Sequence, residues 1–245
     1  MQRIIASWNV LADGYVRASY YPRIDPALLV PGARRAALAA QIAERVSLGE
    51  LVCLQEIEPS LVGALRARGV AVEFAPKLGD RPDGIAIAGA GVTDAKTLAF
   101  ADATEQVALI ARIDDAITVA TTHLRWDRPA VAHEQRFAVS QLRELFAELA
   151  TWPRPWIACG DFNFTPDDPA YALLVEAGFV DACRGATANP HGRAKRIDYL
   201  WHTRELVAEA LPTLPVADDT PLPSRDVPSD HVPVAARFSV NSPDA

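Results

Sequence analysis

Residues 105–124 read EQVALIARIDDAITVATTHL, two apolar segments rich in β-branched side chains and separated by a pair of aspartates. Valine, isoleucine and threonine favour extended backbone, and Asp114-Asp115 is typical of a tight turn in a β-hairpin. A fold of regularly alternating strands and helices is therefore excluded, because its strands are joined by helical crossovers rather than by hairpins. The stretch favours a mixed, largely antiparallel sheet system.

The neighbouring sequence extends this sheet system in both directions. Short apolar segments predict further strands at residues 3–8, 51–56, 70–75, 83–89, 96–100, 155–163, 196–202 and 232–240. Amphipathic or capped segments predict helices at 25–47, 59–69, 131–150 and 167–178, and the proline-rich residues 211–229 predict a loop. The expected class is α/β (α+β), with sheets covered by helices.

Size and composition are consistent with one large domain. The chain has 245 residues, 50% of them hydrophobic, which is ample for one core over residues 1–240, with 241–245 as a frayed tail. It has no apolar run of about 18 residues and no signal-peptide pattern, so we expect no membrane contact and a cytoplasmic location. Three cysteines without a CxxC pattern predict core positions rather than disulfides or ligands.

The net charge restricts the partners. A formal charge of −7 argues against broad, sequence-independent binding to a long polyanion. Of the 24 basic residues only Lys77, Lys96 and Lys195 are lysines, and the remaining arginines suit phosphate as well as ordinary surface ion pairs. Composition alone leaves the substrate open, and nothing in it indicates an obligate protein partner.

The most informative motif is GDFN, residues 160–163, at the end of an apolar strand. Side chains two residues apart point the same way on a strand, so Asp161 and Asn163 are expected to face one site. Asp161 can accept a proton or orient a water, and Asn163 can donate to a phosphate oxygen. An ordinary Asp-x-Asn turn is the alternative.

Other polar side chains also follow apolar strands. Glu56 ends such a strand in CLQEIE and needs a cation or several hydrogen bonds there, unless it caps the next helix, and Asn9 ends the first strand in SWNV. Asp230 and His231 are adjacent in PSDHVPV, so one can bind a metal while the other meets the substrate, although a polar turn gives the same pattern.

Two further residues complete the set. His123 ends the strand in TTHLRWD, where a structural hydrogen bond is the alternative, and Asp198 in RIDYL is a buried carboxylate for which His231 is the natural partner. Carboxylates, amides and imidazoles without thiolates indicate a hard cation, Mg²⁺ or Mn²⁺. No HExxH, GxSxG or Walker motif is present.

SWNV, LQE, THL, GDFN, RIDY and SDHVPV follow one another from Ser7 to Val234. In that order they resemble the endonuclease/exonuclease/phosphatase superfamily, which shares the fold of pancreatic deoxyribonuclease. WNVLADGY, LQEIE, THLRWD, GDFNFTPDD and IDYLWHT resemble most its deadenylase, nocturnin and Angel branch. The resemblance implies a four-layer sandwich of two mixed sheets flanked by helices and a Mg²⁺-dependent enzyme acting on RNA ends or small nucleotides.

The resemblance also implies roles for the residues. Glu56, Asn9 and Asp230 are expected at the metal, Asp161 at the attacking water, and Asn163 and His123 at phosphate oxygens. His231, oriented by Asp198, is expected to contact the phosphoryl group. Additional phosphate contacts are expected from Lys77, Arg81, Arg125 and Arg193, with Asp13 also near the site.

Two departures affect the substrate. In members that remove poly(A), a proline directly follows the stretch corresponding to HLRWD, and an aromatic residue lies just before IDY. Here Arg128 precedes Pro129, and Arg193, Lys195 and Arg196 stand before the IDY motif. The basic residues favour a terminal phosphate or a phosphate-rich nucleotide, or form a solvated loop.

The leading prediction is a phosphodiesterase acting on RNA 3′ ends or nucleotides, similar to a deadenylase. Alternatives are a phosphatase of terminal, cyclic or 2′ phosphates and a lipid phosphoesterase, for which an apolar membrane-binding hairpin is missing. A catalytically silent binding module on the same fold is the alternative from another class.

Overall fold

Two six-stranded β-sheets form the centre of the molecule. The structure, a computed structural model, describes residues 2–128 and 130–240, so the frayed tail expected at 241–245 lies outside the described residues. The first sheet has the strand order β11-β12-β1-β2-β4-β3, and the second has the order β5-β6-β7-β8-β10-β9. Each sheet is antiparallel except for one parallel pair, β1 with β2 and β7 with β8. The mixed, largely antiparallel prediction is confirmed.

The strand bounds of the first sheet are β1 Gln2–Asn9, β2 Leu51–Ile57, β3 Val72–Pro76, β4 Gly84–Ala88, β11 Leu206–Ala210 and β12 Val234–Val240. Those of the second sheet are β5 Val92–Ala99, β6 Val107–Ile113, β7 Ile117–His123, β8 Trp156–Asp161, β9 Phe179–Asp181 and β10 Asp198–Thr203. The aspartates between β6 and β7 both have positive φ, 50° and 51°, as a tight hairpin turn between twisted strands requires.

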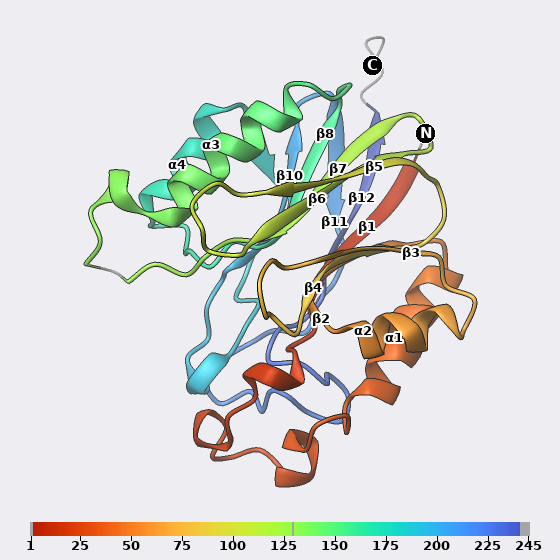
Figure 1. Ribbon diagram of the computed structural model, residues 1–245, viewed down its shortest axis with the longest axis vertical. Helices are drawn as coiled ribbons and strands as arrows, with labels where there is room; N and C mark the ends of the chain where they lie inside the picture. Colours follow the sequence, from red (N-terminus) through yellow and green to blue (C-terminus); the bar gives the residue numbers. More distant parts are fainter. Residues whose placement is uncertain (1, 129, 241–245) are drawn as a thin grey trace.

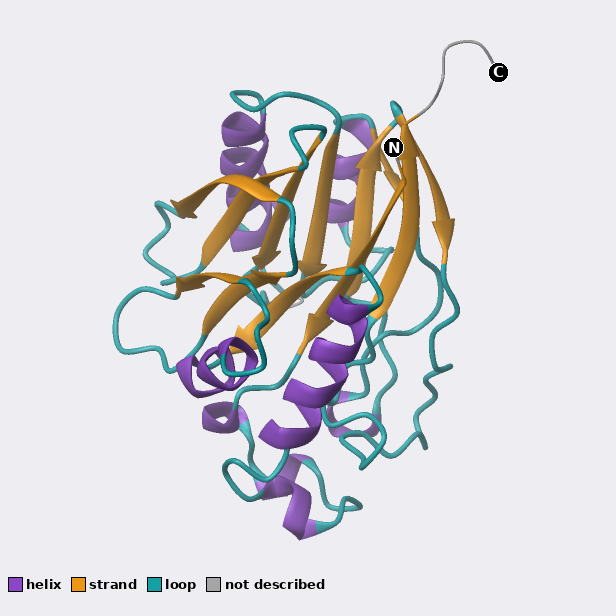
Figure 2. Cartoon of the chain, turned by 90° about the vertical axis from the view of Figure 1, so that its right-hand side faces the viewer, coloured by secondary structure: helices purple, strands orange, loops and turns teal. Residues whose placement is uncertain are grey.

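Within residues 2–128 and 130–240, four α-helices cover the outer faces of the two sheets. Helices α1 (Arg35–Ser47) and α2 (Pro59–Arg66) lie on the first sheet, and α3 (Phe137–Leu149) and α4 (Pro169–Glu176) lie on the second. Figure 1 shows the two pairs on opposite sides of the strands, and Figure 2 shows the sheets between them. The chain is thus a four-layer sandwich.

Apolar side chains fill three spaces between these layers. One cluster lies between the sheets and includes Leu51, Val119 and Ile157, all at most 1% exposed. The other two lie between each sheet and its helices, around Trp8 and Trp201. Strands that are buried on both faces explain why their sequences are continuous apolar runs rather than alternating ones.

Two predicted helices are shorter in the structure than in the sequence prediction. The segment expected to be helical from Asp25 to Ser47 is divided, with a 3₁₀ turn η3 at Pro26–Leu29 and α1 beginning only at Arg35. Pro31 and Gly32, whose φ is +81°, separate the two parts. Likewise α3 begins at Phe137 rather than at Val131. The short strands β9 and β11 were not predicted.

The order of the strands brings the ends of the two parallel pairs together. β1 contacts β8, and β2 contacts both β7 and β8 across the space between the sheets. The carboxyl ends of β1, β2, β7 and β8 therefore open at one edge of the sandwich, where parallel strands present polar side chains. Within the described residues no helix is both long and apolar enough to cross a membrane.

Candidate active site

Backbone register places three of the predicted residues in one row. His123 is the last residue of β7, Asp161 is the last of β8 and Asp198 is the first of β10. In the strand ladders His123 pairs with Asp161, and Asp161 pairs with Asp198. Neighbouring residues of paired strands project on the same side of a sheet, so the three side chains converge without any contribution from loops.

The glycine before Asp161 makes this row possible. Gly160 has a φ of +140°, and a Cβ atom there would collide with the carbonyl oxygen of Thr122. Only glycine tolerates both the backbone conformation and the close approach of β7. The GDFN motif therefore needs its first residue for structural reasons.

The first sheet supplies two more residues, each at a strand end. Asn9 ends β1, and Glu56 lies in a β-bulge of β2, where the register with β4 shifts between Gln55 and Ile57. Glu56 has a φ of +56°, which is unusual for a residue with a side chain, and Asn163, two residues after the end of β8, has +55°. Such backbone conformations concentrate at functional sites, where they aim a side chain.

Asn9 joins the carboxylates of the two sheets. Its amide nitrogen donates to Glu56 Oε1 and to Asp161 Oδ2, both at 3.0 Å. Its amide oxygen accepts from the backbone nitrogen of Leu11 at 3.0 Å, and Ala12 N donates to Glu56 Oε2. At the predicted metal site, the amide nitrogen of Asn9 therefore faces two carboxylates, while the amide oxygen faces the backbone. Binding a metal through this oxygen would require rotation of the amide.

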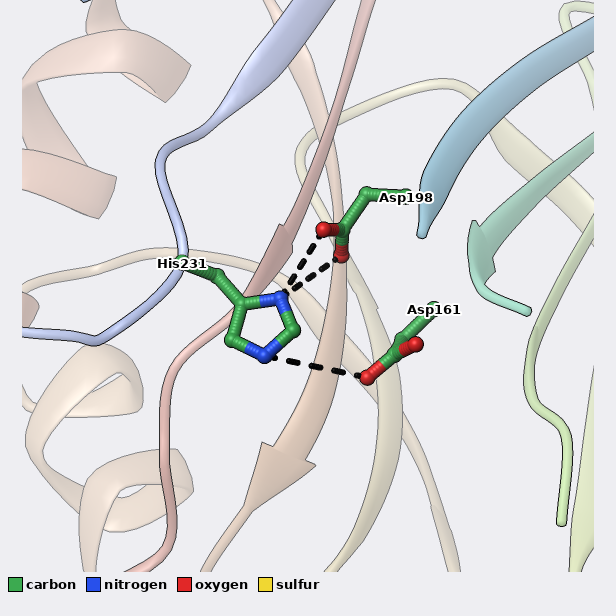
Figure 3. A group of neighbouring side chains, drawn as sticks. All are labelled: Asp161, Asp198 and His231. Carbon is green, nitrogen blue, oxygen red and sulfur yellow. Dashed lines mark hydrogen bonds and ion pairs between the residues drawn. The ribbon is translucent and has the colours of Figure 1, made fainter. Parts of the chain in front are cut away.

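The loop before β12 contributes Asp230 and His231. Ser229 Oγ donates to the carbonyl of Asn9 at 2.6 Å, and the indole of Trp8 donates to the carbonyl of His231 at 2.9 Å. These bonds fix the loop against the end of β1. His231 Nδ1 lies 2.9 and 3.1 Å from the carboxylate oxygens of Asp198, which confirms the predicted partnership (Figure 3).

The opposite nitrogen of His231 faces the centre of the cluster. His231 Nε2 is 3.8 Å from Asp161 Oδ2 and 3.9 Å from Asp230 Oδ1, as Figure 3 shows for Asp161. Burial by itself lowers the pKa of His231, but the negative charge of Asp198 outweighs it and holds the pKa well above the usual value. His231 is therefore a cation with its Nε2–H aimed into the site.

His123 has the opposite character. Burial and the nearby charge of Lys77 hold its pKa well below the usual value, so the imidazole is neutral. Asn163 Nδ2 lies 3.0 Å from the carbonyl of Leu124 and 2.9 Å from His123 Nε2, which makes Nε2 the acceptor and assigns the proton to Nδ1. The two histidines thus differ in charge at neutral pH.

Asp161 lies between them. Its Oδ1 accepts from the backbone nitrogen of Asn163 at 3.0 Å, and its Oδ2 is 3.6 Å from His123 Nε2. Burial, followed by the negative charge of Asp198, raises the pKa of Asp161 to about 7. A carboxyl group with that pKa can both accept and release a proton at neutral pH.

The donor set fits a hard cation. Asp230 Oδ1 is buried and has no hydrogen-bond partner, and burial raises the pKa of Glu56, whose charge lacks sufficient compensation. A divalent cation held by oxygens of Glu56 and Asp230 would satisfy both groups. Asp161, Asp198 and His231 offer ligand atoms that lie within 4.8 Å of one another, but Asp198 pairs with Nδ1 of a cationic His231, and an imidazolium has no lone pair to give to a metal.

The four predicted phosphate contacts have different surroundings. Lys77 is buried at the cluster, 2.6 Å from Asp83 Oδ2 and 3.5 Å from His123 Nδ1. Arg81 forms an ion pair with Glu105 at 2.5 Å. The side chains of Arg125 and Arg193 are exposed. Of the four, the structure brings Lys77 to the cluster.

Asp13, the fifth residue expected near the phosphate, has a structural partner. Its carboxylate pairs with the guanidinium of Arg34 at 2.7 Å and accepts from the backbone of Gly32. Arg34 is 2% exposed and also donates to the carbonyls of Val10 and Pro228, so the pair ties together the loops that carry Asn9 and Asp230.

The sequence patterns did not indicate several supporting residues. Thr187 Oγ donates to Asp198 Oδ2 at 2.6 Å, Tyr15 donates to Asp83, and Tyr21 donates to Asp230 Oδ2 at 2.9 Å. All three come from irregular segments or 3₁₀ turns, where hydrophobic periodicity carries no signal. The proximity of Asp83 to Lys77 in KLGDRPDG was the one available hint.

A cleft of about 900 Å³ adjoins the cluster. Asn163 lines it from the cluster side, and its other walls include Tyr20, Trp126, His191 and Lys195. Tyr20 and Trp126 are 43% and 52% exposed, although both are large aromatic side chains. Exposed aromatic faces beside a polar cluster are suited to stacking against a planar group of a ligand.

This fold, with carboxylates, amides and two differently charged histidines at one sheet edge, defines a hydrolase of phosphate esters. The sequence of residues 6–231 matches the Endonuclease/Exonuclease/phosphatase family, and the chain belongs to that family. None of the curated protein sequences compared with the chain matches it.

Solved structures similar to the chain support the same fold. ANGEL2, a 2′,3′-cyclic phosphatase in complex with adenosine-2′,3′-vanadate, has a TM-score of 0.83 at 19% identity, covering 98% of this chain and 96% of that one. The human Nocturnin catalytic domain with bound sulfate has a TM-score of 0.72 at 22% identity, with 98% and 94% covered. D. rerio TDP2 complexed with single-strand DNA product has a TM-score of 0.70 at 18% identity, with 98% and 99% covered.

Proposed function

We propose that the protein hydrolyses phosphodiester bonds of nucleotides or of RNA 3′ ends, with Mg²⁺ or Mn²⁺ as its cofactor. The observation that carries the proposal is the convergence of Glu56, Asp161 and His231 from separate elements beside a cleft with aromatic walls. A net charge of −7 and a cleft of about 900 Å³ favour a short or small substrate over a long nucleic acid.

Asp161 is the residue proposed to take the proton of the attacking water. Its Oδ1 is held by the backbone nitrogen of Asn163 and its Oδ2 by the amide of Asn9, so the carboxylate has one orientation. Its pKa of about 7 makes the ionised form available at neutral pH while keeping the group basic enough to accept a proton. Fixed orientation and matched basicity are what a general base requires.

His231 is proposed to bind a phosphoryl oxygen, and Asn163 is proposed to do so by exchanging its hydrogen bond to His123 Nε2 for one to the phosphate. The imidazolium of His231 directs Nε2–H into the cluster, and Asp198 keeps it there. Charge on phosphoryl oxygens grows toward the transition state, so an oriented cation stabilises that state more than the ground state. Neutral His123, with its proton on Nδ1, positions the amide of Asn163 beside it.

Glu56 and Asp230 are proposed to hold the cation, with Asn9 between Glu56 and Asp161. A bound Mg²⁺ would polarise a phosphoryl oxygen and offset charge that develops there. The buried carboxylates of Glu56 and Asp230 would hold that cation at the end of β1 and β2.

Hydrolysis of a terminal, cyclic or 2′ phosphate is the second candidate. It is favoured by the TM-score of 0.83 to ANGEL2, described as a 2′,3′-cyclic phosphatase, and by Lys195 in the wall of the cleft. The same water, base and phosphoryl contacts serve a cyclic diester, in which one P–O bond to the ribose breaks and the ring opens.

The test is a substrate panel. The protein is incubated with Mg²⁺ or Mn²⁺ and short RNA, DNA, 2′,3′-cyclic phosphate and dinucleotide substrates, and the products are identified by mass. We expect metal-dependent release of a nucleotide or opening of the cyclic phosphate, and loss of most turnover in Glu56→Ala and Asp161→Ala with an unchanged circular dichroism spectrum.

The controls separate the alternatives. Arg204→Ala changes an exposed side chain just after β10, at the opposite end of that strand from Asp198, and serves as the matched surface variant. If the wild-type protein binds the substrates but releases no product with either metal, it is the silent binding module. Near-native turnover in either Glu56→Ala or Asp161→Ala would contradict the assigned roles. A cytoplasmic location and the lack of an obligate protein partner stay predictions from the sequence.

A further inference from the structure

The segment from η2 (Ala18–Tyr20) to η3 contains two adjacent tyrosines with different surroundings. Tyr21 is 6% exposed, and its hydroxyl donates to Asp230 Oδ2 at 2.9 Å across 209 positions of sequence. Tyr20 is largely exposed and lines the cleft next to the cluster. One dipeptide therefore contacts both the proposed cation site and the proposed substrate cleft.

The hydrogen bond from Tyr21 fixes how Asp230 is oriented. A phenol donates one hydrogen bond, and a carboxylate that accepts it through Oδ2 is prevented from rotating freely. The other oxygen, Oδ1, is buried, has no hydrogen-bond partner and lies 3.9 Å from His231 Nε2. Tyr21 thus leaves one oxygen of Asp230 free on the side of the cluster.

Tyr20 contacts another residue that lines the cleft. Its ring centroid lies 4.2 Å from that of His191 with an interplanar angle of 56°, and 6.5 Å from that of Tyr21. A planar ligand that stacks on Tyr20 therefore changes the surroundings of the Tyr20–His191 pair. Because Tyr20 and Tyr21 are adjacent in the chain, a shift of the backbone at Tyr20 also moves Tyr21.

The segment has room to move. A cavity of about 80 Å³ lies behind it, lined by Tyr20, Tyr21 and Ile24 on one side and by Asn189 and Leu222 on the other. A close-packed core would resist a shift of even a methyl group, but a segment backed by a cavity adjusts at small cost.

We propose that Tyr20 and Tyr21 couple the cleft to the cation site: Tyr21 is a positioning residue for Asp230, and a base stacked against Tyr20 changes the affinity for the cation. The proposal rests on the proposed function for its cation and its ligand class. It adds that the cation and the base bind cooperatively through the protein. Such coupling is reciprocal, so the cation changes the affinity for the base by the same factor.

The test measures binding without catalysis. Free Mn²⁺ is measured by electron paramagnetic resonance in titrations of the full chain, with and without saturating adenosine. Adenosine carries no phosphate, and 2′,3′-dideoxyadenosine, which also lacks the ribose hydroxyls that could ligate Mn²⁺, is titrated beside it. A change in Mn²⁺ affinity that both nucleosides cause passes through the protein. Binding of adenosine itself is measured by calorimetry in the presence and absence of Mn²⁺.

We expect adenosine to tighten Mn²⁺ binding to the wild-type protein about 5-fold or more, within the usual range of coupling between sites. Tyr21→Phe keeps the ring but removes the donor, and it should weaken Mn²⁺ binding about 10- to 100-fold, as loss of a partner of a metal ligand does. Tyr20→Leu should abolish the effect of adenosine and leave the affinity for Mn²⁺ alone within about 2-fold.

The matched control is Tyr171→Phe. Tyr171 also donates to a carboxylate, Asp181 Oδ2 at 3.1 Å, but away from the cluster. The Tyr171→Phe variant should bind Mn²⁺ with the same affinity as the wild-type protein. Equal Mn²⁺ affinities in Tyr21→Phe and wild type would overturn the positioning role, and absence of adenosine binding or of its effect would overturn the coupling. Both results are independent of hydrolysis, so a protein that shows the coupling but cleaves nothing would refute only the proposed function.

Discussion

Asp198→Asn removes the negative charge beside His231 while keeping the size of the side chain. Two opposite charges about 4 Å apart interact by about 4 kcal/mol at an effective dielectric constant of 20. Without that charge, the main cause that raises the pKa of His231 is lost and burial, which lowers the pKa, remains. The group that is a cation at neutral pH in the wild type would become neutral in the variant.

The sign of the effect defines the assay. A raised histidine pKa means that the charged form, and the function that depends on it, is present at low pH and lost as pH rises through that pKa. We therefore expect the alkaline limb of the kcat/KM profile to move to lower pH in Asp198→Asn. At pH 8, kcat/KM should fall about 10- to 100-fold, because a hydrogen bond between charged groups contributes about 1.5–3 kcal/mol.

A control on the neighbouring strand separates this effect from loss of a buried carboxylate. Asp181 accepts from Tyr171 and forms an ion pair with Arg196 outside the cluster. Asp181→Asn should reduce stability without moving the pH profile. If Asp198→Asn has the wild-type profile and the wild-type kcat/KM at pH 8, the imidazolium has no role in the reaction.

Three further variants test other parts of the structure. At pH 8 without metal, Asp161→Asn should have a larger unfolding free energy than the wild type, because a carboxyl with a raised pKa destabilises the fold when it is ionised. This difference in unfolding free energy should become smaller toward pH 4. A difference that is constant with pH in urea titrations would refute the pKa of about 7. Gly160→Ala should destabilise by about 1–3 kcal/mol or more through its φ of +140° and its collision with Thr122, measured by the denaturant midpoint. Arg34→Met should lower the unfolding free energy by about 3–5 kcal/mol in the same measurement, because it leaves Asp13 and several carbonyls without their donor. A loss below about 1 kcal/mol would show that the buried pair does not hold the loops.

Most of the fold could be predicted from local sequence because its strands are unusually distinct. Continuous apolar runs such as WIACGD and the Asp114-Asp115 turn specify strand and hairpin by themselves. The break between Leu29 and Arg35 was missed because the hydrophobic period continues through it, and only Pro31 and Gly32 oppose the helix. β9 and β11 are short edge strands, held by pairing with a neighbour rather than by their own propensity.

The side chains that the structure brings together could be predicted where a polar residue follows an apolar strand, and were missed where it does not. Glu56 and Asp161 are conspicuous in sequence, because a charged side chain at the end of a buried strand requires a partner. Tyr21 has no such context. Its position next to Asp230 depends on how a loop of irregular backbone folds over the sheet edge, which no periodic pattern encodes.

The row formed by His123, Asp161 and Asp198 has an evolutionary consequence. Because backbone pairing between β7, β8 and β10 sets their spacing, the loops that wall the cleft can lengthen, shorten or change composition without disturbing the chemistry. New specificities can therefore arise by exchange of the surrounding loops, whereas a one-residue slip in any of the three strands would turn a reactive group to the opposite face and abolish activity in a single step.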